Sequence, residues 1–285
     1  THALAQRAGV AFENVDFEVY GLNHLSWTRR AQVGDRDLLA EGLADRTFLE
    51  RLVPWAADRI TAMGRIPVEY LYYWYQTADA LAAMRAEPRT RGEALVQDNA
   101  AMLADVGTMA ASGETGAAIV RYAAYLAARN DTYMDYAKGG TDAAGAARRF
   151  ANVEAAITYL GTQVGGYAEV AMELLAGRIG ATPRRMALNV RSAGTMPGFL
   201  ADDVVETDCD VDAAGVRPRP HASLPVDDLA LATRVKGYER LAVQAIREGS
   251  RGLAVDALVA HPLVDDRVLA ETLVRALGIC GTGNR

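Results

Sequence analysis

One stretch, Val19 to Trp27, does most to restrict the fold of this chain. It holds a glycine, a carboxamide, an imidazole and an indole, and apolar residues alternate with polar ones on both sides of it. Such alternation is the pattern of a strand with one buried face, and Gly21 permits a sharp change of direction. The sequence therefore predicts a strand, a bend at Gly21 and a second strand, with Asn23 and His24 directed to one point.

The imidazole of His24 has two interpretations. A lone histidine is usually a core residue whose ring nitrogens are satisfied by hydrogen bonds. Neutral imidazole is also the commonest protein ligand for metals, and a position beside a carboxamide at a strand end suits a metal site. Residue spacing alone leaves both interpretations open.

Composition excludes several functional classes. The chain has 285 residues, 51% of them hydrophobic and 23% charged, which is enough for a globular core in one large domain or two ordinary ones. A formal net charge of -6 argues against nucleic acid or an anionic membrane as the main partner. No apolar run approaches the roughly 18 residues of a transmembrane helix. The two cysteines, Cys209 and Cys280, suit a reducing compartment, and the cytoplasm is predicted.

The segment from Pro67 to Tyr75 carries four of the twelve tyrosines within six positions. Pro67 suits the first turn of a helix, with Glu69 in the same turn. Aromatic rings at helical spacing are predicted to lie mostly in the core. Tyr70 differs from the others, because a cation or the positive end of a helix can lower the pKa of a phenol at a helix start.

Helical periodicity dominates the remainder of the chain. Because a short sheet accompanies these helices, we expect an α+β, helix-dominated fold, organised as a single domain over 1–285. Its small mixed sheet is predicted from about 15–33, 186–191 and 204–212. The predicted helices lie at about 1–8, 37–63 (interrupted at Pro54), 67–75, 79–136, 143–161, 165–175, 231–245, 250–260 and 265–277.

A series of short motifs runs through the chain in a characteristic order. Together they resemble glycoside hydrolase family 4, whose members are 6-phospho-glycosidases that need NAD and a divalent metal. The resemblance covers nearly all 285 residues and corresponds to the C-terminal portion of the family. The motifs are Tyr20-Gly21-Leu22-Asn23-His24-Leu25-Ser26-Trp27, Ile66-Pro67 with Tyr70-Leu71, Gly165-Gly166-Tyr167, Asn189-Val190-Arg191 with Gly194, Asp203-Val204-Val205-Glu206, Leu224-Pro225, Tyr238-Glu239-Arg240-Leu241 and His261-Pro262-Leu263-Val264.

The resemblance implies a role for each candidate site residue. His24 would be a ligand of a catalytic Mn2+, with Asn23 beside the metal and the sugar. Tyr70 would be the base that removes the proton from C2 of the sugar. Asn189 and Arg191 would bind substrate, and the guanidinium of Arg191 suits a phosphate.

The family's reaction is a redox elimination. The C3 hydroxyl is oxidised with NAD, which acidifies the C2 proton; the aglycone is eliminated, water adds and the ketone is reduced back. A metal at C3 would polarise its oxygen, and its charge would favour a phenolate at Tyr70. The residues that would hold NAD are not assigned.

The chain also departs from the family pattern. A Rossmann-type dinucleotide-binding domain and a metal-binding cysteine are expected upstream of Thr1 and are absent from this chain, so the chain alone is expected to be inactive. In the substrate loop, Ala193-Gly194 replaces an Asn-Gly pair and Ser192 replaces a second asparagine. Val164 stands where an arginine is common. These changes bear on recognition of the sugar and its phosphate.

The resemblance is strongest to the 6-phospho-β-glucosidases, through the continuation Leu25-Ser26-Trp27 and the aromatic residues after Tyr70. Hydrolysis of a phosphorylated disaccharide or aryl glycoside is therefore the predicted function. The alternatives are another specificity (α-glucosidase, α-galactosidase or galacturonase) and a non-catalytic relative that binds a ligand or dimerises. The resemblance further implies a C-terminal fold of the lactate/malate dehydrogenase type and a homodimer or homotetramer.

Overall fold

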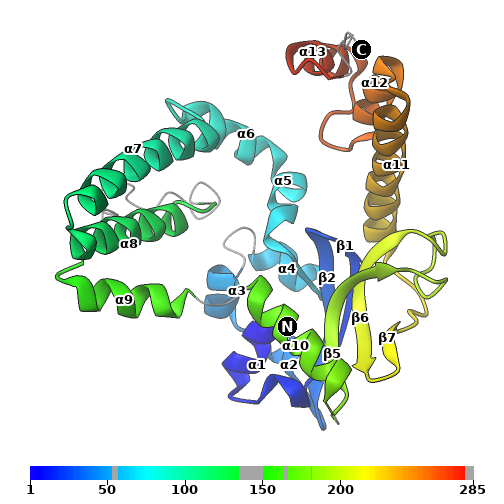
Figure 1. The fold of residues 1–285 in the computed structure, drawn as a ribbon. Coiled ribbons are helices and arrows are strands. Elements are labelled where there is room, and N and C mark those ends of the chain that lie inside the picture. Colours follow the sequence, from blue (N-terminus) through cyan, green and yellow to red (C-terminus); the bar gives the residue numbers. More distant parts are fainter. Residues whose placement is uncertain (53–56, 135–149, 164–165, 181, 280–285) are drawn as a thin grey trace. The chain divides into compact units, whose positions relative to one another are not determined.

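The computed structural model describes residues 1–52, 57–134, 150–163, 166–180 and 182–279, which form two compact units (Figure 1). The first combines Thr1–Tyr75 with Gly177–Arg285, and the second is Gln76–Ala176. The α+β, helix-dominated class is confirmed. The prediction that 1–285 acts as a single domain stays a prediction. Within the described ranges, no helix combines the length and apolar character needed to cross a membrane.

The first unit is built on a seven-stranded sheet in the order β3-β2-β1-β6-β5, with β4 paired to β2 and β7 to β6. All pairings in the described chain are antiparallel, where the sequence predicts a mixed sheet. For the pairs β1–β2, β2–β3 and β6–β7 the reason is local, because two-residue connections can join only antiparallel neighbours. The strands are β1 (Asp16–Leu22), β2 (Leu25–Val33), β3 (Arg36–Asp37), β4 (Ile66–Pro67), β5 (Arg184–Arg191), β6 (Val204–Asp212) and β7 (Gly215–Pro218).

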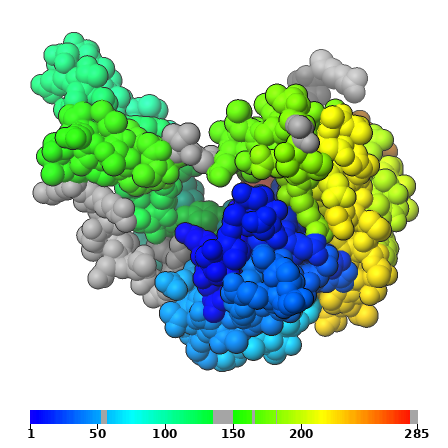
Figure 2. Space-filling view, turned by 90° about the horizontal axis from the view of Figure 1, so that it is seen from below, coloured from blue at the N-terminus to red at the C-terminus, as the bar shows by residue number. Residues whose placement is uncertain are grey.

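Helices flank this sheet in the first unit, and the N-terminal segment (blue) lies beside strands from the far half of the sequence (yellow) (Figures 1 and 2). The long helix α11 (Val226–Glu248) ends at Gly249, whose φ of 61° is the left-handed cap that glycine adopts easily. The other helices are α1 (His2–Ala8), η1 (Phe12–Asn14), α2 (Leu38–Leu43), α3 (Arg46–Leu52), α4 (Ala57–Met63), η2 (Glu69–Leu71), α5 (Tyr72–Tyr75), α12 (Arg251–Ala260) and α13 (Arg267–Ala276).

The second unit is helical throughout its described part. Helix α7 begins with a capping box in which the Thr90 side chain accepts from the Glu93 backbone and the Glu93 side chain accepts in return. Arg121 of α8 donates to Asp105 of α7 at 2.8 Å. The helical patterns expected over about 79–136 correspond to α6, α7 and α8 within the described residues, and the predicted loop at 138–142 lies outside them. The helices are α6 (Thr77–Ala86), α7 (Arg91–Ala111), α8 (Thr115–Asp131), α9 (Val153–Thr162) and α10 (Tyr167–Ile179), which continues into the first unit.

A buried polar cluster connects the sheet to α11. The Tyr20 hydroxyl of β1 donates to Asp228 at 2.6 Å, and the Arg65 guanidinium donates to both oxygens of the same carboxylate at 2.5 and 2.6 Å. Burial, followed by the bond to Asp228, raises the pKa of Tyr20, so its phenol remains a neutral donor. Tyr20 also stacks on the buried Trp27. The cluster therefore fixes the N-terminal end of α11 against β1 and against the segment that leads to Tyr70.

The prediction that Pro67 begins a helix is wrong. Ile66 and Pro67 instead pair with Thr28 and Trp27 of β2, and the first helical turn, η2, starts at Glu69. Proline is tolerated at the edge of a sheet, where its missing N–H breaks no ladder. Tyr70 consequently lies in a short turn directly after an edge strand.

Candidate functional site

The site is organised around the hairpin between β1 and β2. Leu22 pairs with Leu25, so the turn consists of two residues, Asn23 and His24, and both are exposed. His24 has a φ of 62°, a left-handed conformation that is uncommon for a residue with a side chain. Because the turn has only two residues, His24 lies at the tip of the hairpin. Its side chain is exposed, which excludes a core role for the ring.

Gly21 lies inside β1 and does not form the bend, in contrast to the prediction. Its φ is 137°, and a Cβ atom there would lie 2.2 Å from the carbonyl oxygen of Leu25 and 2.7 Å from the Cα atom of Ser26. Glycine is needed because the backbone of β2 occupies the space of a side chain.

The substitution Gly21→Ala is expected to lower the free energy of unfolding by about 1–3 kcal/mol or more, since both the φ angle and the contact are unfavourable. Urea denaturation of the purified protein would measure this. The matched control is Gly237→Ala in α11, where a Cβ meets no atom within 4 Å and a gain of about 0.5–1 kcal/mol is expected. Equal stability of the two variants would contradict the role given to Gly21.

The rings of His24 and Tyr70 meet, which brings the two principal predicted residues together. Their centroids lie 4.4 Å apart with the ring planes at 65°, an edge-to-face contact. His24 comes from the hairpin tip and Tyr70 from η2, and the two segments are joined by the bond from the Val68 amide to the Ser26 carbonyl at 2.9 Å. The sheet pairing of β4 with β2 therefore positions the phenol beside the imidazole.

The other predicted site residues lie on β5. Asn189 and Arg191 are both exposed and, being two residues apart, share one face of the strand. Asn189 is paired with Glu206 of β6, and Glu206 is paired with Gly21 of β1. Opposite residues of antiparallel strands point to the same side, so this face adjoins the hairpin that carries His24. The sheet brings together the two groups of predicted residues.

Glu206 is the site residue that sequence reasoning did not single out. Burial raises the pKa of its carboxyl, and a hydrogen bond with Ser26 and the charge of His24 act in the opposite direction. A carboxylate directly after Val204 and Val205 at the start of a predicted strand was the available signal, since charged residues are rare at buried positions without a partner.

Metal binding by these residues can be judged from the donors present. In the part of the chain that the structure describes, no three His, Cys, Asp or Glu side chains are grouped closely enough to hold a metal ion. The exposed imidazole of His24 suits a divalent transition metal as one ligand, and further donors would have to come from elsewhere. Cys209 is not one of them, because it is buried and burial raises its pKa to about 12; Cys280 lies outside the described residues.

The substrate loop after β5 is held by its own polar groups. Ser192 is buried, its amide donates to the Asp203 carbonyl at 2.7 Å, and its hydroxyl accepts from the Met196 amide at 3.4 Å. Ala193 and Gly194 have φ values of 48° and 80°. Ser192 therefore stabilises the loop and does not reach towards a ligand. Val164 and Gly165, the other positions of the family comparison, lie outside the described residues.

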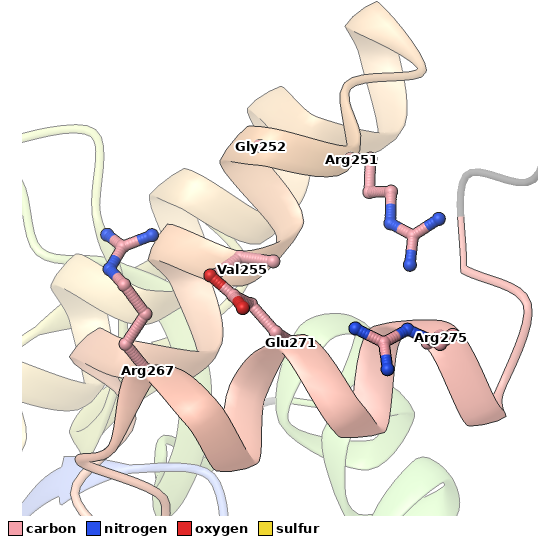
Figure 3. Close-up of a pocket in the computed structure, with 6 residues that line it drawn as sticks. All are labelled: Arg251, Gly252, Val255, Arg267, Glu271 and Arg275. Carbon is pink, nitrogen blue, oxygen red and sulfur yellow. The ribbon is translucent and has the colours of Figure 1, made fainter.

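A separate hollow of about 360 Å³ lies between α12 and α13 (Figure 3). None of the predicted site residues lines it. One of its arginines, Arg267, is already paired with Asp256 at 2.7 Å. It is lined by Arg251, Gly252, Val255, Arg267, Glu271 and Arg275.

Comparison with protein families decides the identity of this fold. Residues 19–264 match the family model of the Family 4 glycosyl hydrolase C-terminal domain. The chain belongs to glycoside hydrolase family 4. The predicted resemblance is thereby confirmed, and the hairpin, η2 and β5–β6 all lie within the part of this family 4 domain that is matched.

Individual relatives of the family 4 domain include both glucosidase types. It is 30% identical over 118 residues to the phospho-alpha-glucosidase PagL of Clostridium acetobutylicum, a match that covers 41% of this chain and 26% of that protein. Its fold is similar to that of the Thermotoga maritima 6-phospho-beta glucosidase solved with manganese, NAD+ and glucose-6-phosphate (TM-score 0.67, 18% identity, 98% of this chain and 56% of that one).

A second solved structure is a 6-phospho-alpha-glucosidase from gut microorganisms, in complex with NAD and Mn2+ (TM-score 0.66, 17% identity, 99% of this chain and 58% of that one). At these identities the likeness shows the fold alone. The chain spans less than three fifths of the length of either solved relative.

Proposed function

We propose that this chain forms the substrate-binding and catalytic half of an enzyme that hydrolyses 6-phospho-β-glucosides, with NAD and Mn2+ as cofactors. The contact between His24 and Tyr70 carries the proposal, because a candidate metal ligand and a candidate base lie next to each other. The relatives solved with NAD, manganese and glucose-6-phosphate support the choice of cofactors and of a phosphorylated sugar. We further propose a cytoplasmic homodimer or homotetramer, as the family resemblance implies.

Each candidate site residue has a distinct role in the proposed reaction. The Tyr70 oxygen removes the proton from C2 of the sugar, and the exposed imidazole of His24 provides a nitrogen donor beside C3. Arg191 binds the 6-phosphate through parallel N–H bonds, and Asn23 and Asn189 bind hydroxyl groups. NAD would supply the hydride acceptor, and a divalent metal held in part by His24 would supply Lewis-acid chemistry.

Arg191 is suitably placed for a phosphate. It is exposed at the end of β5, and within the described chain it makes no ion pair with a carboxylate. A strand rises by about 3.3 Å per residue, so Arg191 lies about 7 Å along β5 from Asn189, a spacing on the scale of one sugar ring. The phosphate and the ring hydroxyls can therefore be bound by neighbouring positions of one strand.

Specificity for an α-glucoside is the second candidate function, and the relationship to PagL favours it. The residues that suggested the β branch lie largely in the core: Trp27 is buried and its indole N–H donates to the Tyr75 hydroxyl at 3.2 Å. These residues bear on packing more than on the orientation of a leaving group. The anomeric preference therefore has to be measured directly.

The deciding experiment measures turnover by the full-length protein with NAD+ and Mn2+. The p-nitrophenyl 6-phospho-β-glucoside should be hydrolysed, whereas the α-anomer should not. The variant His24→Ala should lose Mn2+ affinity by calorimetry and lose turnover with it, while the control His2→Ala, at an exposed position in α1, should retain both. Turnover of the α-anomer alone would favour the second function, and no turnover of either anomer would favour a non-catalytic relative.

A further inference from the structure

Glu206 differs from four other buried or half-buried carboxylates of the first unit. Each of four buried or half-buried carboxylates has an arginine within ion-pair distance. Glu206 is half-buried as well, yet among the described residues it has no ion pair with lysine or arginine. The four pairs are Glu18–Arg29, Asp203–Arg240, Asp208–Arg185 and Asp228–Arg65.

A half-buried carboxylate without a cation is unfavourable for folding, because its charge is partly removed from water without compensation. Groups of this kind occur preferentially where a ligand binds. The raised pKa of Glu206, caused first by burial, reflects the same imbalance. The uncompensated charge of Glu206 therefore suits a partner that comes from outside the described residues.

Gly21 explains how the Glu206 side chain is oriented. Ser26, Gly21, Glu206 and Asn189 are successive partners across four neighbouring strands, so they form one row on one face of the sheet. Gly21 contributes no side chain to this row. The Glu206 carboxyl can therefore extend over β1 and bond the side chain of Ser26, which lies two strands away.

The bond to Ser26 leaves most of the carboxylate available. An ionised carboxylate has about four acceptor sites, and the serine hydroxyl occupies one. On its other side lies Asn189, which is exposed, and the charge of His24 at the hairpin tip lowers the pKa of Glu206 in opposition to burial. The free acceptors consequently face the same surface as the proposed sugar-binding residues.

We propose that Glu206 is a specificity-determining residue that accepts hydrogen bonds from ring hydroxyls of the bound sugar, with Ser26 holding its carboxylate across Gly21. The inference rests on the proposed function, since it assigns the sugar to this face of the sheet. The hydroxyls of a hexose are donors, and a carboxylate accepts from them through charge-assisted bonds that are stronger than those of neutral acceptors. The unpaired charge of Glu206 is then matched by the substrate and by no residue of the chain that the structure describes.

The test measures binding of glucose 6-phosphate and of its 2-, 3- and 4-deoxy analogues to the full-length protein by calorimetry. The wild type should bind at least one analogue about tenfold more weakly than glucose 6-phosphate, as expected for loss of a hydrogen bond to a charged group. In Glu206→Gln this difference should shrink to about threefold or less, and in Ser26→Ala it should be intermediate. The control Asp212→Asn, at the other end of β6, should keep the full difference.

The outcomes separate this inference from the function on which it rests. Sugar phosphate binding by the wild type, with the full tenfold discrimination retained in Glu206→Gln, would overturn the role of Glu206 alone. Failure of the folded wild type to bind any of these sugars would overturn both. Thermal denaturation of each variant verifies that the compared proteins are folded.

Discussion

Replacing Tyr70 by phenylalanine is expected to lower kcat for a 6-phospho-glucoside by about 10²–10⁴-fold, the usual contribution of a positioned general base. The variant removes one oxygen and keeps the ring that contacts His24 edge-to-face. Substrate and metal affinities should therefore change little, and the loss should appear in kcat. Steady-state kinetics of the full-length protein, with Mn2+ affinity measured separately, would show this division.

A second aromatic residue provides the control for Tyr70. Tyr73→Phe makes the same chemical change at a ring that packs against Tyr72, and it should leave kcat nearly unaltered. Deuterium at C2 of the substrate should slow turnover by the wild type if removal of this proton limits the rate. A Tyr70→Phe variant with wild-type kcat would exclude the phenol as the base, whatever the effect of other substitutions.

Replacing Asp228 by alanine is expected to lower the free energy of unfolding by about 3–5 kcal/mol, the range found when one member of a buried ion pair is removed. The carboxylate is buried and accepts from the Tyr20 hydroxyl and from two nitrogens of Arg65, so its loss leaves a guanidinium unpaired inside the protein. Arg65 immediately precedes β4, so the position of Tyr70 should be disturbed as well. Urea denaturation and turnover measure the two effects.

Two variants isolate the buried pair at Asp228. Asp227→Ala removes the neighbouring, exposed carboxylate in the first turn of α11 and should cost no more than about 1 kcal/mol. Tyr20→Phe removes one donor and leaves the arginine paired, so a smaller loss, of about 1.5–3 kcal/mol, is expected. A loss in Asp228→Ala no larger than that in Asp227→Ala would show that the pair contributes little to stability.

Elements with local causes can be predicted from the amino-acid sequence alone. Alternation of apolar and polar residues around 15–33 located the first two strands, and helical periodicity located α11 to α13. The order of motifs led to family 4, which the match over 19–264 confirmed. His24 and Tyr70 were identified as candidates from those motifs, and their roles in metal binding and proton removal stay predictions.

Features that depend on pairing between distant segments could be identified from the three-dimensional fold but not from local sequence patterns. The residues around Pro67 locally favour a helix start, but Pro67 pairs with Trp27 of β2 in the sheet. Glu206 is a candidate sugar-binding residue because it lies in one row with Ser26, Gly21 and Asn189 across four strands. The strand pairing that forms this row is a property of the fold. The physical reason is that paired strands can be separated by many residues along the chain. Neighbouring positions in the sequence therefore reveal neither the space above Gly21 nor the lack of a cation beside Glu206 among the described residues.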